Sequence, residues 1–180
     1  MNKTIIEFFK EILTIIVGIL IALFINNWNE DRKDAKYMNQ IFISMDKELR
    51  ETNKDIKKKM PQQQTLIDTL GFYKKNDTIS IFDVMMKVNG IQMPQIRISS
   101  WKAISSSKIE LLEYDRVSAL ANIEEHTELL TSKTQFLMRF LYPNIKDTST
   151  DKKELIMFMM QDIMVTERGL QKEIEEVIQE

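Results

Sequence analysis

The most constraining feature of the sequence is an uncharged, apolar run from Ile12 to Ile25, close to the N-terminus. A helix of this run alone is about 21 Å long, shorter than the hydrocarbon core of a bilayer at about 30 Å. Extension to Phe8 and Trp28 makes it long enough to cross, with Lys10 and Glu11 near one edge. Because indole rings settle at membrane interfaces, we predict a transmembrane helix over about residues 8–28, with Trp28 as its interface anchor.

Two other interpretations of this run are possible, a cleaved signal peptide and a buried core helix. A signal peptide needs a cleavage site of small residues after its apolar region, and the sequence here reads Leu-Phe-Ile-Asn-Asn-Trp over residues 23–28. A core helix that is apolar on every side must be enclosed by protein. We therefore expect an uncleaved membrane anchor, residues 1–29, followed by a second domain, residues 30–180.

Small and polar residues recur on one side of the predicted anchor. At spacings of three and four they form what we call the small-residue face: Glu11, Thr14, Gly18, Ala22 and Asn26. Small side chains let two helix backbones approach closely in a bilayer, and polar groups at the ends can form hydrogen bonds across the pair. The pattern predicts either a homo-oligomer or a membrane-protein partner bound through this face; a plain tether to the lipid bilayer is the alternative.

The segment GILIALFINNWNEDRK, residues 18–33, with Glu11 ahead of it, resembles the start of a family of small bacterial single-pass membrane proteins of unknown function. WKAISSSKIELL, residues 101–112, resembles a segment of the same family that begins with tryptophan, although Ser107 stands where the family often has glycine. The N-terminal tail is shorter and less basic than is usual there. The resemblance implies a single-pass protein of the bacterial cytoplasmic membrane and no particular activity.

The remainder of the chain has the composition of helices, with few breakers: 4 glycines and 3 prolines in 180 residues. Amphipathic spacing predicts long helices that extend from the anchor to about residue 60, over residues 115–142 and over the C-terminal segment. Pro61 is expected to begin a separate short helix ending near Gly71, and Pro143 to stop the helix before it. We predict an all-α fold in which the transmembrane helix continues into an antiparallel helical bundle.

Charge and reactive residues exclude several classes of function. With 25 basic and 27 acidic residues, the chain lacks the excess positive charge of a nucleic-acid-binding protein. It has no cysteine and one histidine, His126, which does not belong to a Glu-x-x-His pair. Ser105 to Lys108 fit S-x-x-K, but the companion motifs of serine acylation are missing. The polar members of the predicted helix stripes are threonines, so we expect no enzyme, no cofactor and no metal.

These observations favour a non-enzymatic interaction, accessory or sensory module anchored by one transmembrane helix. Few residues precede the anchor, so a signal would have to pass to another membrane protein. The alternative is an oligomeric pore or membrane-active effector, in which Glu11 and Asn26 line or gate the pore. Positive residues are nearly balanced across the anchor, and the basic tail usual in the resembling family would place the N-terminus in the cytoplasm. We therefore expect the bundle to be extracytoplasmic.

Overall fold

The computed structural model describes the backbone of residues 3–179 and the side chains of residues 8–179. Met1, Asn2 and Glu180, which the expected domains include, lie outside these described residues. The elements in chain order are α1 (Lys3–Phe72), α2 (Ile81–Lys87), α3 (Ser99–Ser105), the 3₁₀-helix η1 (Ile109–Leu111), α4 (Tyr114–Asn144) and α5 (Thr150–Gln179). The described residues contain no strand, which confirms the all-α prediction.

The chain divides into two compact units, residues 1–43 and 44–180. The first unit is the N-terminal part of α1, in which every residue from Phe8 to Lys33 is exposed. α1 is helical without a break from Lys3 to Phe72, so the apolar helix continues into the bundle as expected. It is the one helix among the described residues that is long and apolar enough to cross a membrane.

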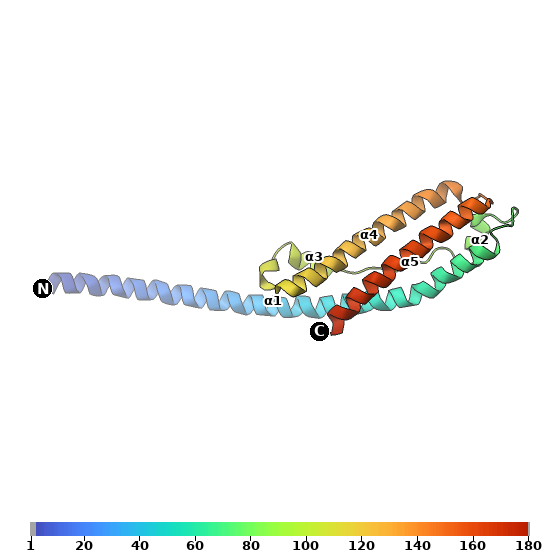
Figure 1. Ribbon diagram of the computed structural model, residues 1–180. Coiled ribbons are helices and arrows are strands. Elements are labelled where there is room, and N and C mark those ends of the chain that lie inside the picture. Colours follow the sequence, from blue (N-terminus) through green and yellow to red (C-terminus); the bar gives the residue numbers. More distant parts are fainter. Residues whose placement is uncertain (1–2, 180) are drawn as a thin grey trace. The chain divides into compact units, whose positions relative to one another are not determined.

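The second unit is a bundle of three long helices, formed by the C-terminal part of α1 with α4 and α5 (Figure 1). α5 runs antiparallel to α1, because its start lies beside the end of α1 (Lys74–Glu154, 2.8 Å) and its end lies beside Lys57 (Lys57–Glu175, 2.7 Å). It is also antiparallel to α4, and α1 and α4 therefore run the same way. The chain returns from the end of α1 to the start of α4 through α2, an extended segment and α3.

The core of the bundle is formed by apolar side chains that recur at helical spacing on the three long helices. α4 contributes Leu120, Ile123, Leu130, Leu137 and Leu141, and α5 contributes Ile156, Met160, Ile163, Leu170 and Ile174. The facing stripe of α1 includes Met45, Leu49, Ile56, Leu66, Ile67 and Leu70, each at most 3% exposed. The amphipathic stripes therefore face the core, as their spacing predicts.

The prediction of a new helix at Pro61 is wrong, because α1 continues through this residue to Phe72. Proline inside a helix costs about 3 kcal/mol, since it lacks an amide hydrogen and crowds the preceding turn. Leu66, Ile67 and Leu70 follow it in the buried stripe, and each contributes about 1.5–3 kcal/mol by its burial. Packing outweighs the proline, and α1 curves in this region (Figure 1). α4 likewise includes Pro143 and ends at Asn144.

The connections are held by local caps and turns. Ser80 caps α2, and its hydroxyl and the Asp83 carboxylate form a capping box. The amides of Ile81 and Phe82 donate to backbone carbonyl groups of the α4–α5 connection, which fixes α2 at that end of the bundle. Asn89 and Gly90 both have positive φ (60° and 79°) and turn the chain into the extended segment.

Candidate functional site

The small-residue face lies on the exposed N-terminal part of α1, where its five residues follow one another along the helix. Gly18 leaves the backbone open, since a β-carbon built there would meet no atom within 4 Å. The Thr14 hydroxyl donates to the carbonyl oxygen of Lys10 (2.9 Å), so that its oxygen remains able to accept a further hydrogen bond. Lys10, Glu11, Thr14 and Ile15 line a shallow hollow at one end of the face. Ala22 and Asn26 continue the same row and are exposed.

Trp28 lies at the end of the apolar run and is 56% exposed. The guanidinium group of Arg32 stands 5.3 Å from the centre of its ring, one helical turn further on. This cation–π contact places a permanent positive charge beside an amphipathic ring. An indole with an adjacent arginine is typical of residues at a membrane–water boundary. There the ring contacts acyl chains and the cation contacts phosphate groups.

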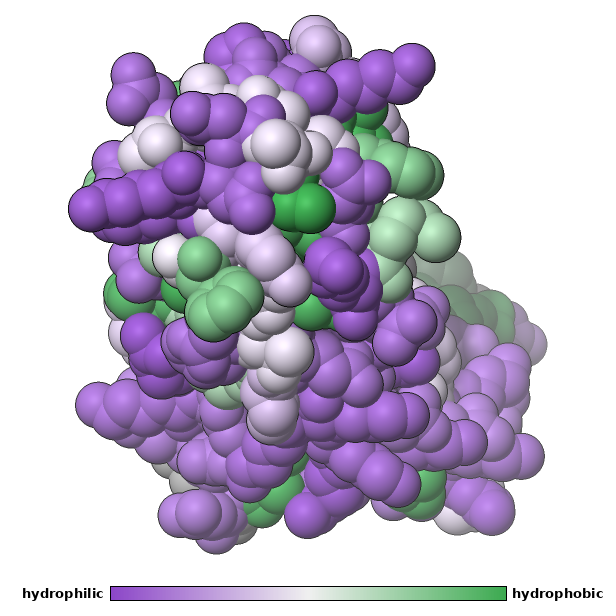
Figure 2. All heavy atoms as spheres, turned by 90° about the vertical axis from the view of Figure 1, so that its right-hand side faces the viewer, coloured by the Kyte–Doolittle hydropathy of each residue, from purple (hydrophilic) through white to green (hydrophobic). Residues whose placement is uncertain are grey.

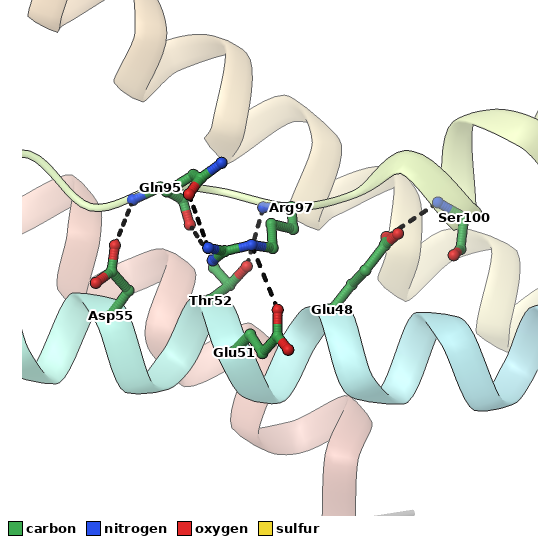
Figure 3. A network of polar contacts seen from close by, with 7 residues as sticks. All are labelled: Glu48, Glu51, Thr52, Asp55, Gln95, Arg97 and Ser100. Atoms are coloured by element: carbon green, nitrogen blue, oxygen red, sulfur yellow. Dashed lines mark hydrogen bonds and ion pairs between the residues drawn. The ribbon is translucent and has the colours of Figure 1, made fainter.

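In the bundle, the sequence did not reveal how the extended segment of residues 91–98, which we call the strap, is held. The strap runs antiparallel to α1, and acceptors on one face of α1 bind the backbone amides at its end (Figure 3). Asp55 accepts from the amide of Gln95 (2.7 Å), buried Thr52 from Arg97 (3.0 Å) and Glu48 from Ser100 at the start of α3 (3.0 Å). These α1 residues replace the hydrogen bonds that a neighbouring strand would otherwise provide.

The side chain of Arg97 strengthens the attachment of the strap. Its guanidinium lies 3.4 Å from Glu51 and donates to the side chain of Gln95 (2.7 Å), as Figure 3 shows. Next along the chain, Trp101 is buried in α3, and its indole N–H donates to Glu124 of α4 (2.6 Å). The Trp-led segment of the sequence therefore joins the strap to α4, so its role in this structure is packing.

A buried polar pair links α1 to α5 in the middle of the bundle. Gln63 and Glu167 are both 0% exposed, and the Gln63 amide donates to Glu167 Oε1 (2.7 Å) and to the carbonyl of Gln92 in the strap (2.9 Å). Burial raises the pKa of Glu167 to about 7, while the hydrogen bond from Gln63 and the nearby charge of Arg168 lower it in part. Among the described residues, no group is within hydrogen-bond distance of Gln63 Oε1 or Glu167 Oε2.

Lys153 is a second buried polar residue, 0% exposed in the first turns of α5. Its ammonium group donates to the carbonyl oxygens of Tyr73 (3.1 Å) and Asn76 (2.7 Å), just beyond the end of α1. Carbonyl groups at a helix C-terminus lack hydrogen-bond donors within the helix and carry partial negative charge. A lysine ammonium group supplies both a donor and a positive charge. Lys153 therefore fastens the start of α5 to the end of α1.

The expectation that threonine alone supplies the polar members of the buried stripes is wrong for Gln63, Lys153 and Glu167. Gln63 is seven residues after Ile56, and Glu167 is four after Ile163, so both occupy core positions at helical spacing. This helical spacing was the signal that could have predicted their burial. A polar side chain at such a position is, however, equally compatible with the exposed edge of an amphipathic stripe. Among the described residues, no group of three or more histidine, aspartate and glutamate side chains could hold a metal ion.

The residues that formally fit S-x-x-K form a helix end. The hydroxyl groups of Ser106 and Ser107 donate to the carbonyls of Lys102 (2.8 Å) and Ala103 (2.7 Å), one turn earlier in α3. His126 lies at the edge of the bundle, with Nδ1 3.1 Å from Glu173 Oε2. Comparison of the chain with family models, with curated proteins and with solved structures gives no match, so the site is interpreted from its own geometry.

Proposed function

We propose that this chain is a single-pass membrane protein whose helical bundle acts as a non-enzymatic interaction, accessory or sensory module. The anchor would be the part of α1 from about Phe8 to Trp28, in a bacterial cytoplasmic membrane. The small-residue face would bind a second copy or another membrane protein. The bundle would lie on the extracytoplasmic side.

One observation carries the proposal: the apolar side chains of residues 12–25 are exposed all round α1. Ile19, Leu20 and Ile21 are 54%, 59% and 55% exposed, and successive residues of a helix point about 100° apart around its axis. In water, each such side chain forgoes about 1.5–3 kcal/mol that burial would provide. A bilayer provides that burial on every side, and a helix satisfies its own backbone polar groups there. Exposure of this kind favours a membrane span over a core helix, whose apolar residues would be covered by protein.

The organisation of the bundle is consistent with a binding module. Three of its buried polar side chains link one segment of the bundle to another. Gln63 of α1 binds Glu167 of α5, Lys153 of α5 binds carbonyl groups just beyond the end of α1, and Thr52 of α1 binds the strap. Each thus has a structural partner within the bundle. Because α1 contains both the small-residue face and the residues that hold the strap, an event in the bundle and an event in the membrane act on one helix.

The proposal is tested by expressing the full chain in bacteria and extracting the membranes with alkaline carbonate. The chain is expected to remain in the membrane pellet. A variant with Val17→Arg and Leu20→Arg places two charges at the bilayer centre, at about 2.5–3.5 kcal/mol each on insertion scales, and should be recovered in the soluble fraction. Asp31→Arg and Gln40→Arg, which lie beyond the span, form the matched control. Release of the unsubstituted chain by carbonate would refute the span.

A further inference from the structure

The bundle carries exposed apolar side chains along one face of the α4–α5 pair. They recur at helical spacing, with Leu129 and Phe136 on α4 and Leu155, Phe158 and Val165 on α5. Between them lies a hollow of about 340 Å³, lined by Ser132, Lys133, Phe136, Leu155, Phe158, Met159 and Asp162. We call this surface the α4–α5 face. By contrast, the end of the bundle that carries the α4–α5 connection is mainly hydrophilic (Figure 2).

The area of this face approaches what one partner contributes to a stable interface. The exposed fractions are 45% for Leu129, 63% for Phe136, 40% for Leu155, 67% for Phe158 and 57% for Val165. With about 200 Å² for a fully exposed aromatic residue, the five present roughly 500 Å² of apolar surface. A polar rim around them brings the face close to the roughly 800 Å² that each partner buries in an interface of standard size. A contiguous apolar patch with a polar rim is typical of a protein-binding surface.

The charges around the apolar centre are arranged so that the face complements itself. Lys133 and Asp162 pair at one end of the hollow (2.8 Å), at a level between Leu129 and Phe136 along α4 and between Phe158 and Val165 along α5. On α4 an acid precedes this level and a base follows it, namely Glu128 and Arg139, which are exposed. On α5 the same order holds, with Glu154 before this level and Arg168 after it, both exposed; Glu154 is also the ion-pair partner of Lys74 within the same copy.

Two copies of such a face, related by a twofold axis, place acids opposite bases. If the axis runs along the helices, α4 faces α5 of the second copy, so that Glu128 meets Arg168 and Arg139 meets Glu154. If the axis crosses the helices, α4 faces α4, so that Glu128 meets Arg139, and Glu154 meets Arg168. A twofold interface uses the same surface on both copies, and the surface must therefore be self-complementary in this way.

We propose that the α4–α5 face binds the same face of a second copy of this chain. The apolar centre supplies the area, with Phe136 and Phe158 as the central aromatic residues, and the charged rim selects the orientation. The contact lies wholly within the bundle, so it does not depend on the proposed membrane span or on the small-residue face.

Cross-linking tests this contact directly, because the chain has no cysteine of its own. Two samples of full-length protein in detergent micelles are treated with a short bis-maleimide: Ser132→Cys alone, and Ser132→Cys mixed with Gln161→Cys. Gln64→Cys on α1, treated in the same way, gives the background yield. We expect at least one of the two samples to give at least five times as much cross-linked dimer as this background. Adding Phe136→Ser and Phe158→Ser should reduce the yield at least fivefold, whereas Phe72→Ser, an exposed phenylalanine elsewhere, should not.

Circular dichroism checks that the serine variants remain folded, which is expected because they alter exposed side chains. A yield no higher than that of Gln64→Cys in both samples would overturn the proposal. So would a yield unchanged by the two serine substitutions. The result is distinct from that of carbonate extraction, since the chain can dimerise through this face whether or not it spans a membrane.

Charge exchange then distinguishes the two orientations. Glu128→Arg alone should weaken the dimer about tenfold in either, because two attractive pairs per dimer become repulsive. Combination with Arg139→Glu restores binding if α4 faces α4, since the exchanged residues meet each other. If α4 faces α5, the combination weakens binding further. A dissociation constant unchanged by Glu128→Arg would contradict the role assigned to the charged rim.

Discussion

The buried Glu167 makes the stability of the bundle depend on pH in a direction that can be worked out. The ordinary pKa of a glutamate is 4.5, and burial raises that of Glu167 to about 7 in the folded protein. Between these two pH values the folded protein holds a proton that the unfolded chain has released. The free energy of unfolding therefore falls as pH rises from about 4.5 to about 7, and the loss is complete above pH 7.

The size of the effect follows from the difference between the two pKa values. From 4.5 to about 7 the difference is about 2.5, and at 1.36 kcal/mol per pKa unit it corresponds to about 3 kcal/mol. Glu167→Gln has the same shape, keeps an oxygen to accept from Gln63 and cannot ionise. The variant should match the unsubstituted protein near pH 4.5 and exceed its stability by about 3 kcal/mol at pH 8.

The measurement is urea unfolding of the full chain in mild detergent micelles at a series of pH values from 4.5 to 8.5. Trp101 is buried in α3 and reports unfolding of the bundle once Trp28→Phe has removed the other tryptophan. Glu110→Gln, an exposed glutamate in η1 outside the α4–α5 face, is the matched control and should change stability by less than about 0.5 kcal/mol. The reasoning is refuted if Glu167→Gln gives no gain at pH 8, or if its gain is the same at pH 4.5.

Three further substitutions test other parts of the structure. Lys153→Met should lower stability by about 2–3 kcal/mol, because two carbonyl oxygens at the end of α1 lose their buried donor; urea unfolding measures this, and the prediction is wrong if the change is below about 0.5 kcal/mol. Thr52→Val should lower stability by about 1–2 kcal/mol and speed hydrogen exchange at the amide of Arg97. If other contacts hold the strap, exchange at this amide will not change. Gly18→Leu should weaken association of the anchor in bilayers, where Ile19→Leu should not; unchanged association would exclude the small-residue face, and ion leak from liposomes tests the pore alternative.

Much of the fold was predictable because the spacing of apolar residues in the sequence indicates the long helices. The stripe of α4, for example, follows directly from leucines and isoleucines three and four residues apart, and it lies in the core. Helix ends were less predictable, since Pro61 and Pro143 are signals of termination that tertiary packing can override. A local cost of about 3 kcal/mol is smaller than the burial of several large side chains that lie beyond it.

The polar contacts of the bundle were not predictable from the sequence alone. The strap has no periodic pattern, and its position depends on backbone amides meeting acceptors on α1 some forty to fifty residues earlier in the chain. Glu167 and Lys153 look like ordinary surface charges until partners from another helix are placed beside them. The residues of the proposed anchor differ in this respect. The small-residue face follows from spacing alone, because the helix itself brings its members into line.

The most direct test of the account is whether the two ends of the proposed anchor lie on opposite sides of a membrane. In a chain without cysteine, Lys3→Cys and Lys146→Cys each introduce a single thiol, the second in the exposed α4–α5 connection. Intact bacterial spheroplasts are treated with a membrane-impermeant maleimide before and after lysis. We predict that Lys146→Cys is labelled without lysis and Lys3→Cys only after it. Labelling of both thiols under the same condition would contradict a membrane span, and the reverse order would contradict an extracytoplasmic bundle.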